Sequence, residues 1–210
     1  MRVTSRGQGD PFLLLHAGGE RRSVWELVAD LLVGAGTQAV FPDQRGHGQS
    51  SGSSTDGLAA YGRDVEALLR QIGNPAVTIV GASLGGLAIM AASADGSLVN
   101  RVARVVLVDV IPDPDPSAVA TFLASTVGAH SHGSLVEDAS TMVQRLRLGT
   151  SRFEMPTVLV RGGRSRVVSD DDVSRLLELV PHLLVRVIGG ASHLVARDAP
   201  AELAAILLDR

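Results

Sequence analysis

The feature that most constrains the fold of this chain is a regular alternation of short apolar runs with longer amphipathic segments. Six runs have the length and composition of buried strands: 12–15, 37–41, 76–80, 105–110, 157–160 and 183–188. Segments with apolar residues at helical spacing separate most of them, such as Leu58–Ile72 and Leu84–Ala94. This alternation predicts an α/β fold with a mostly parallel, doubly wound sheet that helices cover on both faces.

The length and apolar content of the chain indicate one domain. The chain has 210 residues, of which 45% are hydrophobic, so we expect a single domain over 1–210. The alternation is interrupted over 111–155, which begins with a stretch rich in proline and aspartate at 112–116. Two helices are expected there, near 117–127 and 134–148. We interpret 111–155 as a short helical cap inserted over the edge of the sheet.

Two local patterns predict where helices begin. Ser23, with Glu26 three residues later, has the pattern of a capping box and predicts a helix from there to about residue 33. The acidic run Asp170-Asp171-Asp172 is expected to begin another helix, because negative charge is favourable at a helix N-terminus.

Composition excludes several classes of function. The formal net charge is −3, which gives no basic surface for nucleic acid. There is no cysteine, so disulfides and thiolate chemistry are excluded. The first residues form no apolar leader, and no apolar run is long enough to span a bilayer. We therefore expect a soluble cytoplasmic protein without nucleic-acid or membrane partners.

The pentapeptide Gly81-Ala82-Ser83-Leu84-Gly85 matches the pattern G-x-S-x-G. It follows an apolar strand and precedes a helix of small residues, so Ser83 is expected on a sharp strand-to-helix turn. Glycines suit this turn because it strains the backbone and leaves no room for side chains beside it. A serine there becomes a nucleophile when a neighbouring base takes its proton. The alternative is a small residue that is merely tolerated at a helix start.

The base in such a site is a histidine that a third group orients. His193 is the candidate, because it lies in the loop after the last strand and ligands of open parallel sheets bind at the carboxyl ends of the strands. A surface or capping role is the alternative. His16 is expected to brace the turn that it begins, and His47 is expected to have a structural role in its loop.

An oxyanion hole requires two backbone N–H donors near Ser83. The first candidate is Leu84, which follows the nucleophile at the start of a helix. The second is Gly18 in the turn His16-Ala17-Gly18-Gly19, where the missing side chain lets the backbone approach a substrate. A plain glycine turn is the alternative. This chemistry requires neither a metal nor a cofactor.

Taken together, four segments resemble the α/β-hydrolase superfamily, of the esterase, epoxide hydrolase and haloalkane dehalogenase kind: 16–19, 43–50, 81–86 and 190–193. The resemblance covers nearly the whole chain and implies a cap between the sixth and seventh strands, which matches 111–155. It also places the start of the chain at or just before the second strand, so that the first strand is missing. Relatives that hydrolyse epoxides or haloalkanes use an aspartate nucleophile. Ser83 therefore implies acyl transfer, on an ester, thioester, lactone or amide.

The resemblance leaves the catalytic acid open. In the family the acid usually follows the seventh strand, and by that alignment the position holds Arg166, which cannot accept a hydrogen bond from a histidine. Asp109 is the substitute that we favour, because some relatives take their acid from the end of the sixth strand. Asp113 and a site without an acid are the alternatives.

The predicted function is a small serine hydrolase that acts on a small-molecule acyl substrate. Ser83 is the nucleophile, His193 the base and Asp109 the acid. One alternative is an enzyme of the same fold that performs elimination, cyclisation or C–C cleavage, with Arg166 bound to a substrate carboxylate. Another is a binding protein with a degenerate site. A missing edge strand leaves a sheet edge for a second copy, so a homodimer is a further expectation.

Overall fold

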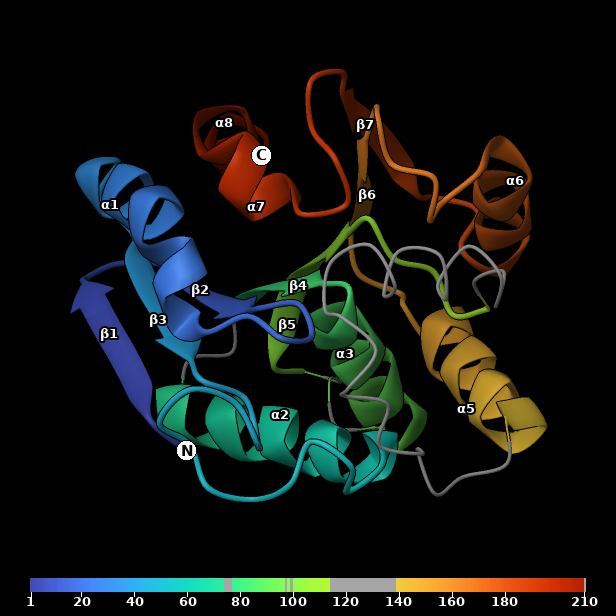
Figure 1. Cartoon of the computed structure of the whole chain (residues 1–210), viewed down its shortest axis with the longest axis horizontal. Coiled ribbons are helices and arrows are strands. Elements are labelled where there is room, and N and C mark those ends of the chain that lie inside the picture. The colour runs from blue at the N-terminus through green and yellow to red at the C-terminus, as the bar shows by residue number, and fades with distance from the viewer. Residues whose placement is uncertain (74–76, 97, 99, 114–138, 210) are drawn as a thin grey trace.

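One seven-stranded sheet organises the molecule (Figure 1). The computed structural model describes residues 1–73, 77–96, 98, 100–113 and 139–209. In spatial order, the strands are β1 (Val3–Gly7), β3 (Gln38–Pro42), β2 (Pro11–Leu15), β4 (Val77–Ala82), β5 (Val102–Val108), β6 (Thr157–Gly162) and β7 (Leu184–Ile188). Neighbouring strands are parallel except β1 and β3, which pair antiparallel. The predicted mostly parallel sheet is confirmed.

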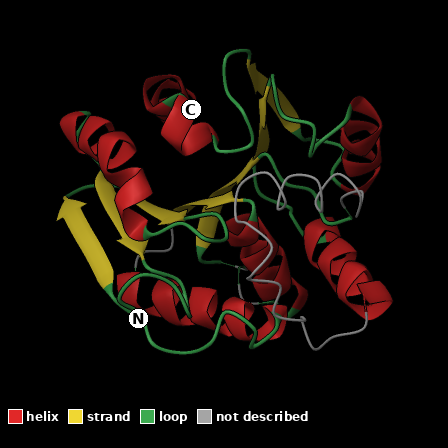
Figure 2. Cartoon of the chain, in the orientation of Figure 1, coloured by secondary structure: helices red, strands yellow, loops and turns green. Residues whose placement is uncertain are grey.

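Helices pack on both faces of this sheet (Figure 2). One face carries α1 (Glu26–Gly34), α7 (Val195–Asp198) and α8 (Pro200–Leu208). The other carries α2 (Leu58–Ile72), α3 (Leu84–Ala94), α5 (Ala139–Ser151) and α6 (Asp170–Leu179). Successive side chains of a strand point to opposite faces, so Phe12 and Leu14 of β2 join the first core while Leu13 and Leu15 join the second.

Some of the predicted helix starts are confirmed and one is wrong. The bounds of α2 and α3 are those predicted, and α6 begins at Asp170 with its three aspartates in the first turn. The capping box predicted at Ser23 and Glu26 is wrong. A 3-10 helix, η1 (Arg22–Trp25), occupies that position and leads directly into α1, with no side-chain cap on either helix. A capping box exists instead in α6, between Ser169 and Asp172.

The antiparallel edge strand β1 was not among the predicted strands. Its sequence, VTSRG, has a single large apolar residue, and its side chains are exposed or half-buried. A strand of this kind contributes little to the core and carries no apolar run that would reveal it. The described residues form seven strands, and the expectation of a missing first strand stays a prediction.

The segment 111–155 is only partly described. Residues 114–138 lie outside the described residues, and with them the predicted helix near 117–127 and most of the expected cap. The described part contains α5, which packs against α3 in the helical layer. Gly149 lies so close to α3 that a Cβ atom built on it would be 1.8 Å from the Met90 carbonyl oxygen. An ion pair between Arg145 and Asp95, at 2.6 Å, also joins the two helices.

The contact at Gly149 gives a stability prediction. Gly149→Ala should lower the free energy of unfolding by about 1–3 kcal/mol, because α5 must move away from the α3 backbone to accommodate the methyl group. Gly34→Ala is the matched control, since nothing lies within 4 Å of a Cβ there. Alanine is the better helix former, so this variant should be unchanged or up to about 1 kcal/mol more stable. Equal effects in urea denaturation would contradict the close approach.

Candidate active site

The polar residues singled out from the sequence gather at the carboxyl ends of the parallel strands. His16 follows β2, Ser83 follows β4 and Asp109 follows β5, while His193 lies in the loop after β7. These strand ends share one edge of the sheet because β2, β4, β5, β6 and β7 are neighbours that run in the same direction. This is the edge at which open α/β sheets bind ligands.

Ser83 occupies a strained turn between β4 and α3. Its backbone dihedrals are φ 46° and ψ −111°, which an L-residue rarely adopts and which cost about 1–3 kcal/mol unless the surroundings hold them. The surroundings are close: a Cβ on Gly81 would lie 2.5 Å from the Gly86 nitrogen, and one on Gly85 would lie 2.4 Å from the Leu15 carbonyl oxygen. The expected sharp turn at Ser83 is therefore present, and its side chain is partly exposed.

Asp109 and His193 form a buried pair. The Asp109 Oδ2 and His193 Nδ1 atoms are 2.7 Å apart, and the two residues are 0% and 5% exposed. Asp109 reaches the histidine from a turn with a positive φ of 51°, in which its N–H donates to the Val160 carbonyl at 2.8 Å. A carboxylate only accepts, so the proton of this bond belongs to Nδ1 of the histidine. Nε2 of the neutral ring then carries no proton.

The loop after β6 completes the surroundings of this carboxylate. The Gly162 N–H donates to Asp109 Oδ1 at 2.9 Å, and the Ser165 hydroxyl donates to Oδ2, the oxygen that also faces His193. The sequence analysis missed Ser165. The available signal was its place in the loop that carries the acid in most relatives, one residue before Arg166. In this chain the loop after β6 donates hydrogen bonds to the Asp109 carboxylate, and the carboxylate itself comes from the end of β5.

The alternative acid, Asp113, is engaged in ion pairs, and the proposed substrate-binding residue, Arg166, is exposed. Asp113 forms an ion pair with Arg147 at 2.6 Å, and Arg175 lies 3.7 Å from the same carboxylate oxygen. Arg166 is exposed in the loop after β6. Its role in binding substrate stays a prediction.

Gly18 lies beside Leu84, as the oxyanion-hole prediction requires. A Cβ on Gly18 would be 3.8 Å from the Leu84 Cβ, so the turn after β2 approaches the start of α3. Leu84 is the first residue of α3, where backbone N–H groups have no acceptor within the helix. The two segments that carry the predicted donors are therefore neighbours, and their role as an oxyanion hole stays a prediction.

His16 holds this turn through hydrogen bonds of its ring. Its Nε2 accepts the Gln44 N–H at 3.0 Å, and its Nδ1 donates to the Ala17 carbonyl at 2.8 Å. The Ala17 carbonyl and the Gly18 N–H belong to one rigid peptide and point in opposite directions. The ring therefore fixes the direction of the proposed oxyanion donor. Burial is the main cause that lowers the pKa of His16 to about 4, which keeps the ring neutral as these bonds require.

Glu20 closes the same turn and was also missed by the sequence analysis. Its N–H donates to the Ala17 carbonyl at 3.2 Å, and its carboxylate accepts the Ala17 N–H at 3.3 Å. Burial raises the pKa of the Glu20 carboxyl, while the Ala17 N–H and the charges of Arg197 and His193 act in the opposite sense. Glu20 thus holds both the N–H and the carbonyl of Ala17, the residue before Gly18.

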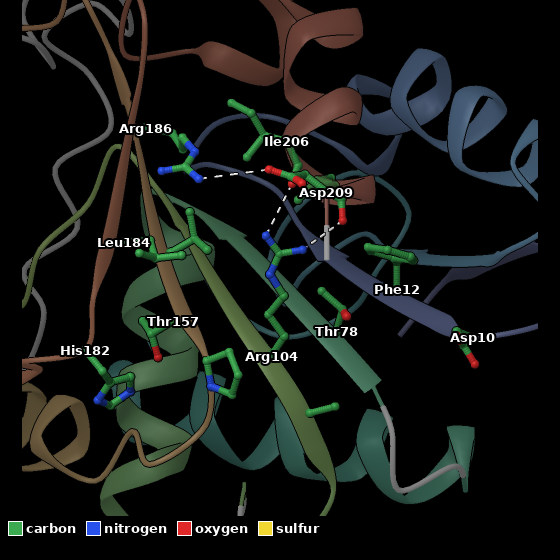
Figure 3. Close-up of a pocket in the computed structure, with 14 residues that line it drawn as sticks. Asp10, Phe12, Thr78, Arg104, Thr157, His182, Leu184, Arg186, Ile206 and Asp209 are labelled. Carbon is green, nitrogen blue, oxygen red and sulfur yellow. Dashed lines mark hydrogen bonds and ion pairs between the residues drawn. The ribbon is translucent and has the colours of Figure 1, made fainter.

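Three further features of the described residues bear on function. They contain no group of three or more His, Cys, Asp or Glu side chains that would hold a metal ion. No helix in the described ranges is long and apolar enough to cross a membrane. A cavity of about 590 Å³ opens at the opposite, amino-terminal ends of the strands, where Arg104 donates to the Leu207 and Ile206 carbonyls at the end of α8 (Figure 3). It is separate from the group around Ser83.

The shifted pKa of His16 gives a prediction on stability against pH. The unfolded chain takes up a proton near pH 6.5, whereas the folded protein resists it down to about pH 4. The contribution of His16 is therefore fully present above pH 6.5 and is lost as the pH falls, by roughly 3 kcal/mol in total. In urea denaturation between about pH 7.5 and pH 4, His16→Gln should show a shallower loss of stability than the wild type. A His16→Gln slope equal to that of the wild type would contradict the account, and His182→Gln, at an exposed position, is the control.

With this geometry described, comparison with known proteins identifies the family. The family model of the alpha/beta hydrolase fold matches residues 10–129, more than half of the chain. Esterase Rv0045c of Mycobacterium tuberculosis (strain ATCC 25618 / H37Rv) is 26% identical, in an alignment that covers 96% of this chain and 82% of that protein.

Solved structures show the same fold. A thioesterase domain from the curacin biosynthetic pathway superposes with a TM-score of 0.82 at 17% identity, covering 99% of this chain and 94% of the domain. The crystal structure of esterase Rv0045c from Mycobacterium tuberculosis gives a TM-score of 0.71 at 24% identity, covering 95% of this chain and 83% of the esterase. The chain belongs to the alpha/beta-hydrolase family.

Proposed function

We propose that the protein is a serine hydrolase that cleaves a small ester, thioester or lactone through an acyl-enzyme intermediate. The observation that carries the proposal is the 2.7 Å contact between His193 and the buried carboxylate of Asp109, at the strand edge that also holds Ser83 on its strained turn. Nucleophile, base and orienting acid then come from three different strand ends, in the chain order Ser, Asp, His that is typical of this fold.

In the first step, Ser83 attacks the substrate carbonyl while Nε2 of His193 takes the hydroxyl proton. The tautomer that Asp109 imposes leaves Nε2 without a proton, as this transfer requires. The imidazolium that forms is stabilised by the carboxylate, which also accepts hydrogen bonds from Gly162 and Ser165. His193 then returns the proton to the leaving group, and the acyl group stays on Ser83.

The negative charge of the tetrahedral intermediate falls on the carbonyl oxygen. The N–H groups of Leu84 and Gly18 are proposed to hold it, with the Gly18 peptide oriented beforehand by His16. Water, activated by His193 in the same way, resolves the acyl-enzyme in the second half of the reaction. No step requires a group from outside the chain other than substrate and water.

The substrate class rests on chemistry and on similarity. A serine nucleophile forms a covalent ester that water can cleave, which suits acyl substrates. Similar proteins include one named an esterase and one named a thioesterase domain. We propose that exposed Arg166, in the loop after β6, binds a polar or anionic part of the substrate.

The assignment of the acid is tested by two matched substitutions. Asp109→Asn should lower kcat on p-nitrophenyl acetate by about 10²- to 10⁴-fold, because the amide can donate to Nδ1 and favours the wrong histidine tautomer. Asp113→Asn, which removes the same charge from the ion pair with Arg147, should keep activity within about threefold. Thermal unfolding of both variants checks that the fold is intact.

The reverse result would overturn the assignment. Full activity of Asp109→Asn together with loss in Asp113→Asn would make Asp113 the acid. If the wild type hydrolyses the ester only slowly, and both variants and Ser83→Ala hydrolyse it at the same low rate, a binding protein with a degenerate site would be favoured.

A further inference from the structure

We propose that His47 is a positioning residue for the oxyanion hole, which it serves by holding the Gly19 N–H and so fixing the backbone on the far side of Gly18. The inference rests on the function proposed above. It assigns a role in catalysis to a loop, 43–50, that contributes none of the nucleophile, base, acid or oxyanion donors.

Two hydrogen bonds define the state of the His47 ring. Its Nε2 accepts the Gly19 N–H at 3.2 Å, and its Nδ1 lies 2.8 Å from the Arg45 carbonyl oxygen. A backbone N–H only donates and a carbonyl only accepts. Both bonds therefore exist together only when the ring is neutral, with its proton on Nδ1. The His47 side chain is half-buried, so its hydrogen bond to the Gly19 N–H lies at the edge of the site and not in the core.

His47 and His16 act on consecutive peptides. His16 donates to the Ala17 carbonyl and holds the Ala17–Gly18 peptide, whereas His47 accepts from Gly19 and holds the Gly18–Gly19 peptide. Gly18 is the joint between these two planes. The two rings lie 5.1 Å apart with an angle of 62° between their planes, so they support the turn as one edge-to-face pair.

The turn needs this hydrogen bond from His47 because it contains two adjacent glycines. Gly19 has a φ of 76°, and nothing lies within 4 Å of a Cβ built on it. Glycine adopts a positive φ without strain, but many other backbone conformations are also accessible to it, so a hydrogen bond is needed to hold one of them. Without a partner for the Gly19 N–H, the Gly18–Gly19 segment would sample other orientations and would displace Gly18 from its place beside Leu84.

His47 can hold the turn because its own loop is rigid. The buried Asp43 carboxylate accepts the N–H groups of Gln49, at 2.9 Å, and Arg22, at 2.8 Å. A Cβ on Gly48 would lie 2.3 Å from the Asp43 carboxyl carbon, so the loop passes directly over this side chain. The His47 N–H donates to the Gln44 carbonyl at 3.0 Å, and Gln44 in turn binds His16.

The test compares His47→Phe, which removes the acceptor and keeps a ring, with His47→Gln, whose side-chain oxygen can replace Nε2. Full loss of one oxyanion donor costs about 10²–10³ in kcat, and a loosened donor costs less. We therefore expect His47→Phe to lower kcat on p-nitrophenyl acetate roughly tenfold, with KM within about twofold. His47→Gln should recover most of the loss. His182→Phe, at the opposite end of the strands, is the control and should leave kcat unchanged.

Hydrogen exchange of the Gly19 amide, followed by NMR, is the second measurement. His47→Phe should accelerate this exchange, and His47→Gln should restore protection. Unchanged exchange in His47→Phe, or an unchanged kcat, overturns the proposal. If the wild type hydrolyses no ester while exchange accelerates in His47→Phe, the contact is supported, but the proposed function and with it the catalytic role of His47 are overturned.

Discussion

The site depends on one buried hydrogen bond, between the Asp109 carboxylate and the His193 ring, which joins positions 84 residues apart. Removing a carboxylate fully from water costs free energy unless hydrogen-bond donors compensate the lost solvation. Here three donors do so: the His193 Nδ1–H, the Gly162 N–H and the Ser165 hydroxyl. Strand β6 lies between β5 and β7 in the sheet. The loop that follows β6 is therefore placed to bind Asp109, which follows β5, where it meets His193 in the loop after β7.

Backbone strain and close packing hold the remaining parts in place. Only three non-glycine residues in the described ranges have a positive φ, and two of them are Ser83 and Asp109. Both follow buried parallel strands that cannot shift without disrupting the core. The glycines around Ser83 let β4, α3 and the end of β2 approach within distances that any side chain would prevent. The strain is thus supported by packing remote from the reaction, a common property of functional turns.

Local patterns predicted most of this architecture, because strand alternation, helical spacing and the G-x-S-x-G turn are encoded by neighbouring residues. Ser83, His193 and the bounds of α2 and α3 are of this kind. Local patterns do not predict the partner of His193, because the choice between Asp109, Asp113 and no acid depends on which strand ends meet in space. Ser165 and Glu20 were missed for the same reason: each acts through a contact made by the fold. The Ser23 capping box failed because η1 precedes α1 there, and β1 was missed because an exposed edge strand needs no apolar run.

The most direct test of the central claim is to react the protein with a serine-directed fluorophosphonate and to locate the adduct by peptide mass spectrometry. The account predicts one adduct, on Ser83, formed rapidly in the wild type, absent in Ser83→Ala and strongly slowed in Asp109→Asn. No adduct on the wild type, an adduct on another serine, or labelling of Ser83 at the same rate without the Asp109 carboxylate would contradict it.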